Sequence, residues 1–311
     1  MTANTLSGRP PRAALDLTKR RRPVEWTIEA LLALCGVLSI FTTIAIVFTL
    51  LRDGLDFFRD VGFADYLFGT VWQPKGSPQQ FGVLALVGGT MLVSVIALLV
   101  AVPLGLMAAT YLSEYARPRA RRILKPMLEI LAGVPTVVYG FFALTWVTPQ
   151  LSKVFPDMGI FNALSAGLVM GIMIIPTIAS VSEDAMGAVP HSLREGAYGL
   201  GSGKRRVAVR VVIPAALSGI AAGVILGVSR AVGETMIVAV AAGSTPNLTA
   251  NPLESVQTMT GYIASVAGGE SARGTADYSS IFAVGLTLFL ITLILNLISV
   301  RLVRRFRQVY Q

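Results

Sequence analysis

The stretch FGVLALVGGTMLVSVIALLVAVPLGLMAATYLS (residues 81–113) decides the fold class of this chain, because it is free of charge and exceeds the ~20 residues of a membrane-spanning helix. It belongs to a longer charge-free run from Ser77 to Ser113. The ends of this run are polar and amphipathic, so we expect one span near Gly82–Leu104 with a helical extension, and not two spans. The stretch therefore predicts an integral membrane protein.

The composition agrees with this prediction. Hydrophobic residues make up 54% and charged residues 14% of the chain, whereas charged residues are about 25% of an average soluble domain. Five further charge-free runs have a length suited to a span: Ala30–Leu51, Ile130–Ser152, Met158–Ser182, Val211–Ser229 and Tyr278–Val300. We expect an all-α membrane protein with six transmembrane helices, kinked where Pro103, Pro135 and Pro176 interrupt them.

Basic residues alternate between the connecting segments, which predicts the topology through the positive-inside rule. Segments 1–26, 114–126, 182–216 and 301–311 carry six, five, five and four Lys or Arg residues. Segments 52–76, 149–162 and 242–277 carry three, one and one. Two spans within the second run would break this alternation. We therefore expect both termini in the cytosol, with a cytosolic tail over 1–26 and a membrane domain over 27–311.

Charge and metal-ligand content exclude several function classes. The net charge of +9 is spread over four cytosolic segments without interleaved aromatic residues, so nucleic-acid binding is not expected. Cys35 is the only cysteine and His191 the only histidine. We therefore expect no disulfide, no thiolate metal site and no multi-histidine metal centre.

The segment 182–216 predicts a structured cytosolic loop. Ser192 and Glu195 fit a capping box, and we expect a short helix from about Leu193 to Leu200. Three glycines follow at 199, 201 and 203, and Pro214 marks the expected entry into the fifth span. A helix of this kind can dock a partner, or it can lie at the membrane surface without one. The adjacent pair Glu183 and Asp184 is expected in a solvated turn.

The spacing in this loop resembles the EAA loop of the permeases of bacterial ABC importers, which have the MetI-like, type I fold. The resemblance rests on Glu195-Gly196-Ala197, three residues, Gly201, nine residues, and then Val211-x-Ile213-Pro214. Gly196 replaces the family's central alanine. The resemblance implies that Ser192, Glu195, Gly196, Ala197, Gly201 and Pro214 belong to a loop that docks into an ATPase subunit.

Further segments resemble the PstC-type permease of phosphate importers. They are VPLGLMAATYLSEYA (102–116), EILAGVPTVVYGFFAL (129–144), GIMIIPTIASVSEDAM (171–186) and SRAVGETMIVAVAAG (229–243). The run Gly233–Met236 distinguishes this type from its paralogous partner, PstA. The resemblance implies translocation of inorganic phosphate across the bacterial inner membrane.

Arg230 and Glu234 interrupt the fifth apolar region. Their i, i+4 spacing places them on one helix face, about 24 Å along the helix from Pro214 at 1.5 Å per residue. Charges inside a membrane usually face a cavity or a partner. The pair is either a mutual salt bridge that holds the helix in place, or, as the resemblance implies, a polar gate in which Arg230 meets the anion and Glu234 positions it.

The sequence also indicates which partners are needed. It contains no G-x-x-x-x-G-K-[ST] motif, so ATP must be used by separate nucleotide-binding subunits, expected in two copies, and no cofactor is expected on this chain. The resemblance also implies a second, PstA-type permease subunit and an external phosphate-binding protein.

Other function classes stay open. The cargo can be another oxyanion, such as molybdate, sulfate or phosphonate. A secondary transporter is disfavoured because no inverted repeat is visible. An intramembrane enzyme is disfavoured because neither H-E-x-x-H nor G-x-S-x-G occurs.

Overall fold

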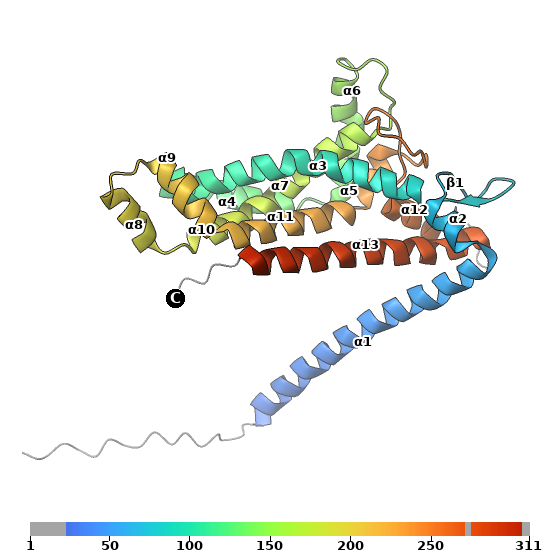
Figure 1. Ribbon diagram of the computed structural model, residues 1–311, viewed down its shortest axis with the longest axis horizontal. Helices are drawn as coiled ribbons and strands as arrows, with labels where there is room; N and C mark the ends of the chain where they lie inside the picture. The colour runs from blue at the N-terminus through green and yellow to red at the C-terminus, as the bar shows by residue number, and fades with distance from the viewer. Residues whose placement is uncertain (1–22, 271–274, 307–311) are drawn as a thin grey trace, which may run out of the picture. The chain divides into compact units, whose positions relative to one another are not determined.

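The computed structural model describes residues 23–270 and 275–306, mostly as helices (Figure 1). The chain forms two compact units, residues 1–48 and 49–311, and helix α1 (Pro23–Asp60) passes from the first into the second. Most of the predicted cytosolic tail, residues 1–22, lies outside the described residues. The predicted border of the membrane domain at residue 27 stays a prediction.

Among the described residues, four helical stretches are long and apolar enough to cross a membrane: Glu25–Asp60, Leu84–Tyr115, Ala163–Gly187 and Ala276–Arg301. Two further stretches meet this criterion only as bent pairs, Pro118–Ala132 with Thr136–Leu151 at 89° and Lys204–Ala215 with Leu217–Val232 at 73°. Six spans are therefore present if each bent pair is counted as one. The second predicted run is a single helix with an extension, as expected: α3 (Leu84–Thr110) continues into the π-helical segment η1 (Tyr111–Tyr115).

The third and fifth predicted spans are each broken into two helices, the third next to Pro135, where a kink was expected. The run 130–152 is broken after α4 (Pro118–Ala132), because Gly133 ends that helix and Pro135 disfavours helical geometry at the residue before it. The run 211–229 is broken at Ala216, between α10 (Ile213–Ala215) and α11 (Leu217–Val232). Pro214 lacks an N–H and crowds the preceding turn, and the π-helical segment η3 (Ala208–Val212) lies directly before α10.

The remaining elements connect these spans. Between α1 and α3 they are α2 (Phe63–Phe68), β1 (Trp72–Gln73) and β2 (Gln80–Phe81). Before α13 they are α12 (Met259–Ser265) and η5 (Val266–Glu270). α5 (Thr136–Phe142), η2 (Ala143–Val147) and α6 (Thr148–Leu151) follow the first break. α7 (Ala163–Gly187), η4 (Val238–Ala242) and α13 (Ala276–Phe306) complete the bundle, with α8 (His191–Gly199) and α9 (Lys204–Val207) in the loop between α7 and α10.

Helices α3 and α7 form the centre of the fold. Small residues let their backbones approach: a Cβ on Gly171 would lie 2.8 Å from the carbonyl oxygen of Ala97, and a Cβ on Gly167 would lie 2.6 Å from Cγ2 of Ile96. Close approach of this kind is the usual basis of helix association in lipid, where burial of apolar surface contributes little. α11 packs against both helices and α13 packs against α11.

An aromatic cluster closes the end of the bundle near α2. Phe57, Tyr66, Trp72, Phe81 and Tyr262 are all buried there and meet edge to face. The two-stranded hairpin pairs Trp72 with Phe81. Burial raises the pKa of the Tyr66 and Tyr262 phenols far above its ordinary value, so both stay neutral hydrogen-bonding groups.

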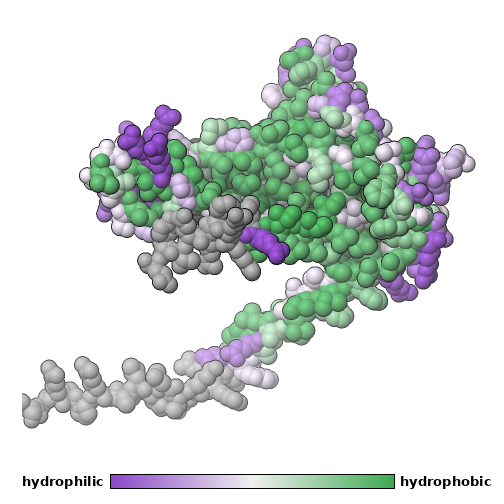
Figure 2. Space-filling view, in the orientation of Figure 1, coloured by the Kyte–Doolittle hydropathy of each residue, from purple (hydrophilic) through white to green (hydrophobic). Residues whose placement is uncertain are grey.

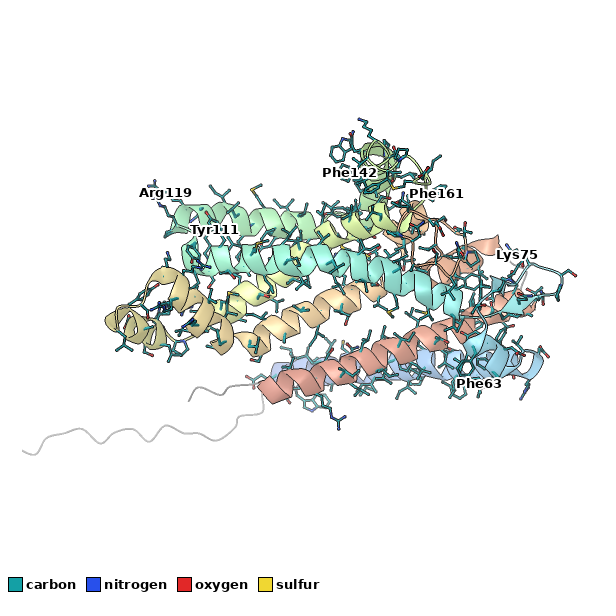
Figure 3. The ribbon with its side chains drawn as sticks, turned by 45° about the horizontal axis from the view of Figure 1, so that its top comes forward. Phe63, Lys75, Tyr111, Arg119, Phe142 and Phe161 are labelled. Carbon is teal, nitrogen blue, oxygen red and sulfur yellow. The ribbon has the colours of Figure 1, made fainter. Side chains whose placement is uncertain are left out.

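The surface of the bundle separates polar from apolar regions. Hydrophobic residues cover the sides of α3 and α11, and hydrophilic residues gather at the two ends (Figure 2). Tyr111 and Arg119 lie at one end, and Phe63 and Lys75 at the other (Figure 3). This distribution is that of a protein whose middle lies in hydrocarbon and whose ends meet water.

The contact between α3 and α7 gives a stability prediction. We expect Gly171→Ala to lower the thermal midpoint of the detergent-solubilised protein, because its new methyl would overpack the backbone of α3 at a cost of ~1–3 kcal/mol. Gly187→Ala on the same helix is the control, since its Cβ meets no atom within 4 Å. Equal midpoints for the two variants would contradict the close approach.

Candidate functional site

Helix α8 is the short helix expected in the loop between the fourth and fifth spans. Its N-cap is Pro190, with φ −55° and ψ 137°, and no side chain caps the helix. The predicted capping box of Ser192 and Glu195 is therefore wrong. Pro190 ends the preceding segment and allows the helix to begin at His191, so Ser192 lies inside the first turn and cannot cap it.

The expected glycine break after α8 is present. Gly201 has a φ of +76°, and its N–H donates to the carbonyl oxygen of Tyr198 at 2.9 Å. The N–H of Ser202 donates to the carbonyl oxygen of Ala197 at 3.1 Å. These two bonds form a Schellman motif, and its left-handed position favours glycine.

The two faces of α8 differ in character. Leu193 and Ala197 pack against a buried hydrophobic cluster that includes Met186 and Val189. Ser192, Glu195 and Gly196 are exposed, and a Cβ on Gly196 would meet no atom within 4 Å. The helix therefore presents the carboxylate of Glu195 beside uncovered backbone, on a surface that is open to a partner.

The second half of the loop is a helical segment from α9 through η3 to α10. Val207, Ala208 and Val212 are buried, while Lys204, Arg205, Arg206 and Arg210 are exposed. Pro214 is exposed in α10, just before the 73° bend into α11. Since the segment crosses the direction of α11, the loop does not feed straight into the fifth span.

Arg230 and Glu234 do not form the expected pair. Arg230 lies in the last turn of α11, and its Nη1 donates to Oγ1 of Thr177 in α7 at 2.9 Å. Gly233 caps the end of this helix, so Glu234 lies beyond it. The expectation that both share one helix face and bond to each other is wrong because the helix ends between them.

Glu234 instead stabilises the start of the next helical turn. Its Oε1 accepts the N–H of Met236 at 3.0 Å and that of Ile237 at 3.3 Å. Its backbone carbonyl oxygen accepts the Thr260 hydroxyl at 2.6 Å. Thr260 follows Met259, whose N–H donates to Oγ1 of Thr90 in α3 at 3.0 Å. The break after α11 is therefore tied to the segment that begins α12 and, through it, to α3.

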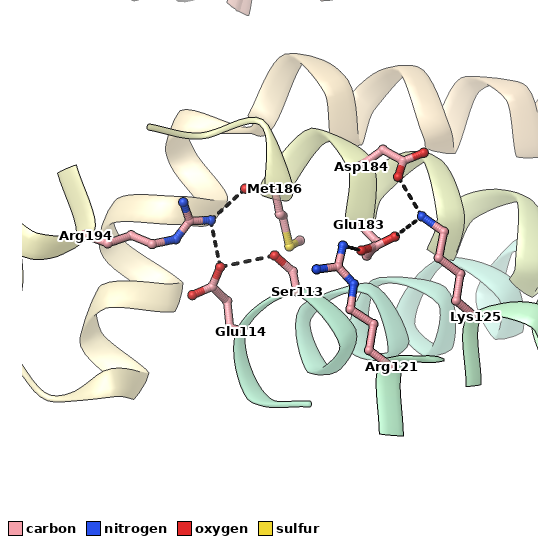
Figure 4. Close-up of polar contacts among 8 residues, drawn as sticks. All are labelled: Ser113, Glu114, Arg121, Lys125, Glu183, Asp184, Met186 and Arg194. Carbon is pink, nitrogen blue, oxygen red and sulfur yellow. Dashed lines mark hydrogen bonds and ion pairs between the residues drawn. The ribbon is translucent and has the colours of Figure 1, made fainter. Parts of the chain in front are cut away.

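Ion pairs at the other end of the bundle were not foreseen from the sequence (Figure 4). Glu183 is fully buried, and it bonds Arg121 and, at 2.7 Å, Lys125 from α4. Lys125 also bonds Asp184 at 2.9 Å. The expected solvated turn at 183–184 is wrong, because α7 continues to Gly187. The i, i+4 spacing of Arg121 and Lys125 was the available signal that one face of α4 meets an acidic partner.

Arg194 also makes an ion pair that the sequence did not reveal. Its Nη2 lies 3.0 Å from Oε1 of Glu114 in η1. In the sequence, Arg194 was counted only among the basic residues of segment 182–216, and Glu114 was not singled out.

Within residues 23–270 and 275–306, no group of three His, Cys, Asp or Glu side chains could hold a metal ion. His191 is exposed at the start of α8.

Comparison with known proteins assigns the family. Residues 101–308 match the family described as "Binding-protein-dependent transport system inner membrane component". The probable ABC transporter permease protein YqgH of Bacillus subtilis is 34% identical over 274 residues, covering 86% of this chain and 88% of the relative. The phosphate transport system permease protein PstC of Pasteurella multocida is 34% identical over 286 residues, with the same coverage of 86% and 88%.

Solved structures agree on the fold. A bacterial ABC transporter involved in the import of the acidic polysaccharide alginate aligns with a TM-score of 0.66 at 16% identity, covering 92% of this chain and 98% of that one. At this identity the likeness shows the fold alone. From the match over residues 101–308 and the two permeases that are 34% identical, we conclude that this chain belongs to the family of binding-protein-dependent transport system inner membrane components, the permeases of ABC transporters.

Proposed function

We propose that this permease carries inorganic phosphate into the cell. The observation that carries the proposal is the 34% identity to a phosphate transport permease over most of both chains. The run Gly233–Met236, on which the resemblance to PstC-type permeases partly rests, contains the break after α11 at which Glu234 lies. Import by this family requires an energy source and a delivery protein, and each needs its own surface.

The proposed complex contains two ATPase subunits, a second PstA-type permease and an external phosphate-binding protein. The ATPase would meet the exposed face of α8 with Glu195 and Gly196, while ATP is bound and hydrolysed outside this chain. The α8 end of the bundle would lie in the cytosol, and so would both termini, in accord with the excess of basic residues in these segments. The end with the aromatic cluster would then face the binding protein.

Arg230 is proposed as the residue that meets the anion. Among the described residues, the neutral hydroxyl of Thr177 is the one side-chain group to which its guanidinium donates. Because Glu234 bonds backbone amides, its carboxylate does not occupy the Arg230 donors. A guanidinium can donate two parallel bonds to two oxygens of one phosphate.

Uptake of radiolabelled phosphate into proteoliposomes with the complete importer tests the cargo. We expect ATP-dependent uptake that unlabelled phosphate suppresses and that equal concentrations of sulfate or molybdate leave almost unchanged. Suppression by sulfate or molybdate instead would assign another oxyanion. Uptake that persists without ATP would contradict the importer class.

We expect Arg230→Gln to reduce phosphate uptake at least about tenfold, because each lost hydrogen bond to a charged group contributes ~1.5–3 kcal/mol. ATP hydrolysis stimulated by the binding protein should survive in part, since the exposed face of α8 is unchanged. Arg119→Gln, an exposed arginine at the start of α4, is the matched control and should transport normally. Normal uptake by Arg230→Gln would remove this residue from the anion path.

A second variant tests the docking face. We expect Gly196→Gln to prevent co-purification of the ATPase subunit, because the new side chain covers the uncovered backbone of α8. The permease itself should keep its thermal midpoint, since no atom lies within 4 Å of the Cβ position. Gly268→Gln places the same side chain at an equally open glycine outside this loop and should leave the complex intact. Retention of the ATPase by both variants would contradict docking at Gly196.

A further inference from the structure

The side chain of Arg194 points away from the exposed face of α8 and contacts two other elements, η1 and α7 (Figure 4). Its Nη2 donates to Oε1 of Glu114 in η1 at 3.0 Å and to the carbonyl oxygen of Met186 in α7 at 2.7 Å. Its Nη1 donates to the carbonyl oxygen of Val189. One guanidinium thus joins α8 to the end of α7 and to the extension of α3.

These contacts are shielded from water. The side chain of Arg194 is 12% exposed and that of Glu114 is 5% exposed. Shielded charge-assisted bonds are the strong class of hydrogen bond, and removal of one partner leaves a buried charge unpaired. The last carbonyl oxygens of α7 also carry the negative end of its dipole, which favours a cation at this position.

The covalent connection from α8 to the fifth span is less direct. It passes through the turn at Gly201 and the glycines on either side of it, and then through the 73° bend at Ala216. A displacement of Glu195 along this route must cross both joints. Arg194, the adjacent residue, connects α8 with α7 and η1 without passing through either joint.

We propose that Arg194 is the positioning residue through which movement of the ATPase at α8 reaches the second and fourth spans. Arg194, Glu114 and the end of α7 form one rigid unit, which moves α3 and α7 together with α8. This inference rests on the proposed docking of the ATPase at α8. According to this inference, the movement is transmitted by the ion pair between Arg194 and Glu114, and not by the covalent connection from α8 to the fifth span.

Distance measurements between spin labels test the rigid unit. Labels are placed at Leu200→Cys, which is 88% exposed at the end of α8, and at Tyr111→Cys, which is 47% exposed in η1, in a Cys35→Ser background. In the complete importer we expect one narrow distance distribution that is the same without nucleotide and with trapped ATP. Arg194→Gln should broaden it at least twofold in both states. A broad distribution in the unmodified pair, or an unchanged one in Arg194→Gln, would overturn the proposal.

Coupling is the second readout. We expect Arg194→Gln to lower the amount of phosphate taken up per ATP hydrolysed about tenfold or more. The reason is that breaking a buried ion pair costs more free energy than a tenfold change in an equilibrium constant. Arg194→Lys should restore part of it, and Arg119→Gln should leave it unchanged. If Arg194→Gln does not assemble, Glu114→Gln removes the opposite charge with nearly the same shape. An undiminished ratio in the assembled variant would refute the coupling role.

The distance measurement and the coupling measurement distinguish a failure of the rigid unit from a failure of the proposed phosphate cargo. The distribution without nucleotide requires neither phosphate nor transport, so it tests the rigid unit by itself. An unmodified importer that hydrolyses ATP without taking up phosphate would refute the proposed cargo and leave the ion-pair link standing.

Discussion

Hydrocarbon offers no hydrogen-bond partner to a peptide group, and this constraint governs how the chain can fold. Long apolar runs must become helices, and every break in a helix must satisfy its own backbone groups. The break after α11 shows how this is met. The Glu234 carboxylate accepts two amides of the following turn, and Thr260 donates to the Glu234 carbonyl oxygen. A charged residue here therefore stabilises an interruption in the backbone.

The same constraint explains which parts of the fold could be predicted. Charge-free runs located the spans, since length and hydropathy alone distinguish a helix in lipid from other structure. The extension of α3 was predictable because a second span would have broken the alternation of basic loops. The short helix α8 was predictable from Pro190 and the glycines around Gly201. Its start was placed too late, because Ser192 was taken as the N-cap, whereas the helix already begins at His191.

The breaks in the helices were foreseen only in part: a kink was expected at Pro135, but neither the bend at Ala216 nor the end of α11 at Gly233 was expected. Gly133 and Pro135 gave a signal for the first break, and Gly233 gave one for the end of α11. The bend at Ala216 has a weaker signal in Pro214, because proline bends some membrane helices and is accommodated in others, as Pro103 and Pro176 are here. The ion pairs of Glu183 and Glu114 depend on contacts between residues far apart in sequence, which periodicity does not encode.

The separation of Arg230 from Glu234 changes the electrostatic argument for anion transport. A carboxylate bonded to Arg230 would have to be displaced before an anion could take its place, at the cost of leaving a negative charge unpaired in low dielectric. In the structure Glu234 is held by amide donors, so binding of an anion at Arg230 leaves its bonds intact. Replacement of the neutral Thr177 hydroxyl costs less than replacement of a carboxylate. At the anion site proposed for Arg230, two charges that stay apart would allow an anion to bind and also to leave, which is what a permease requires.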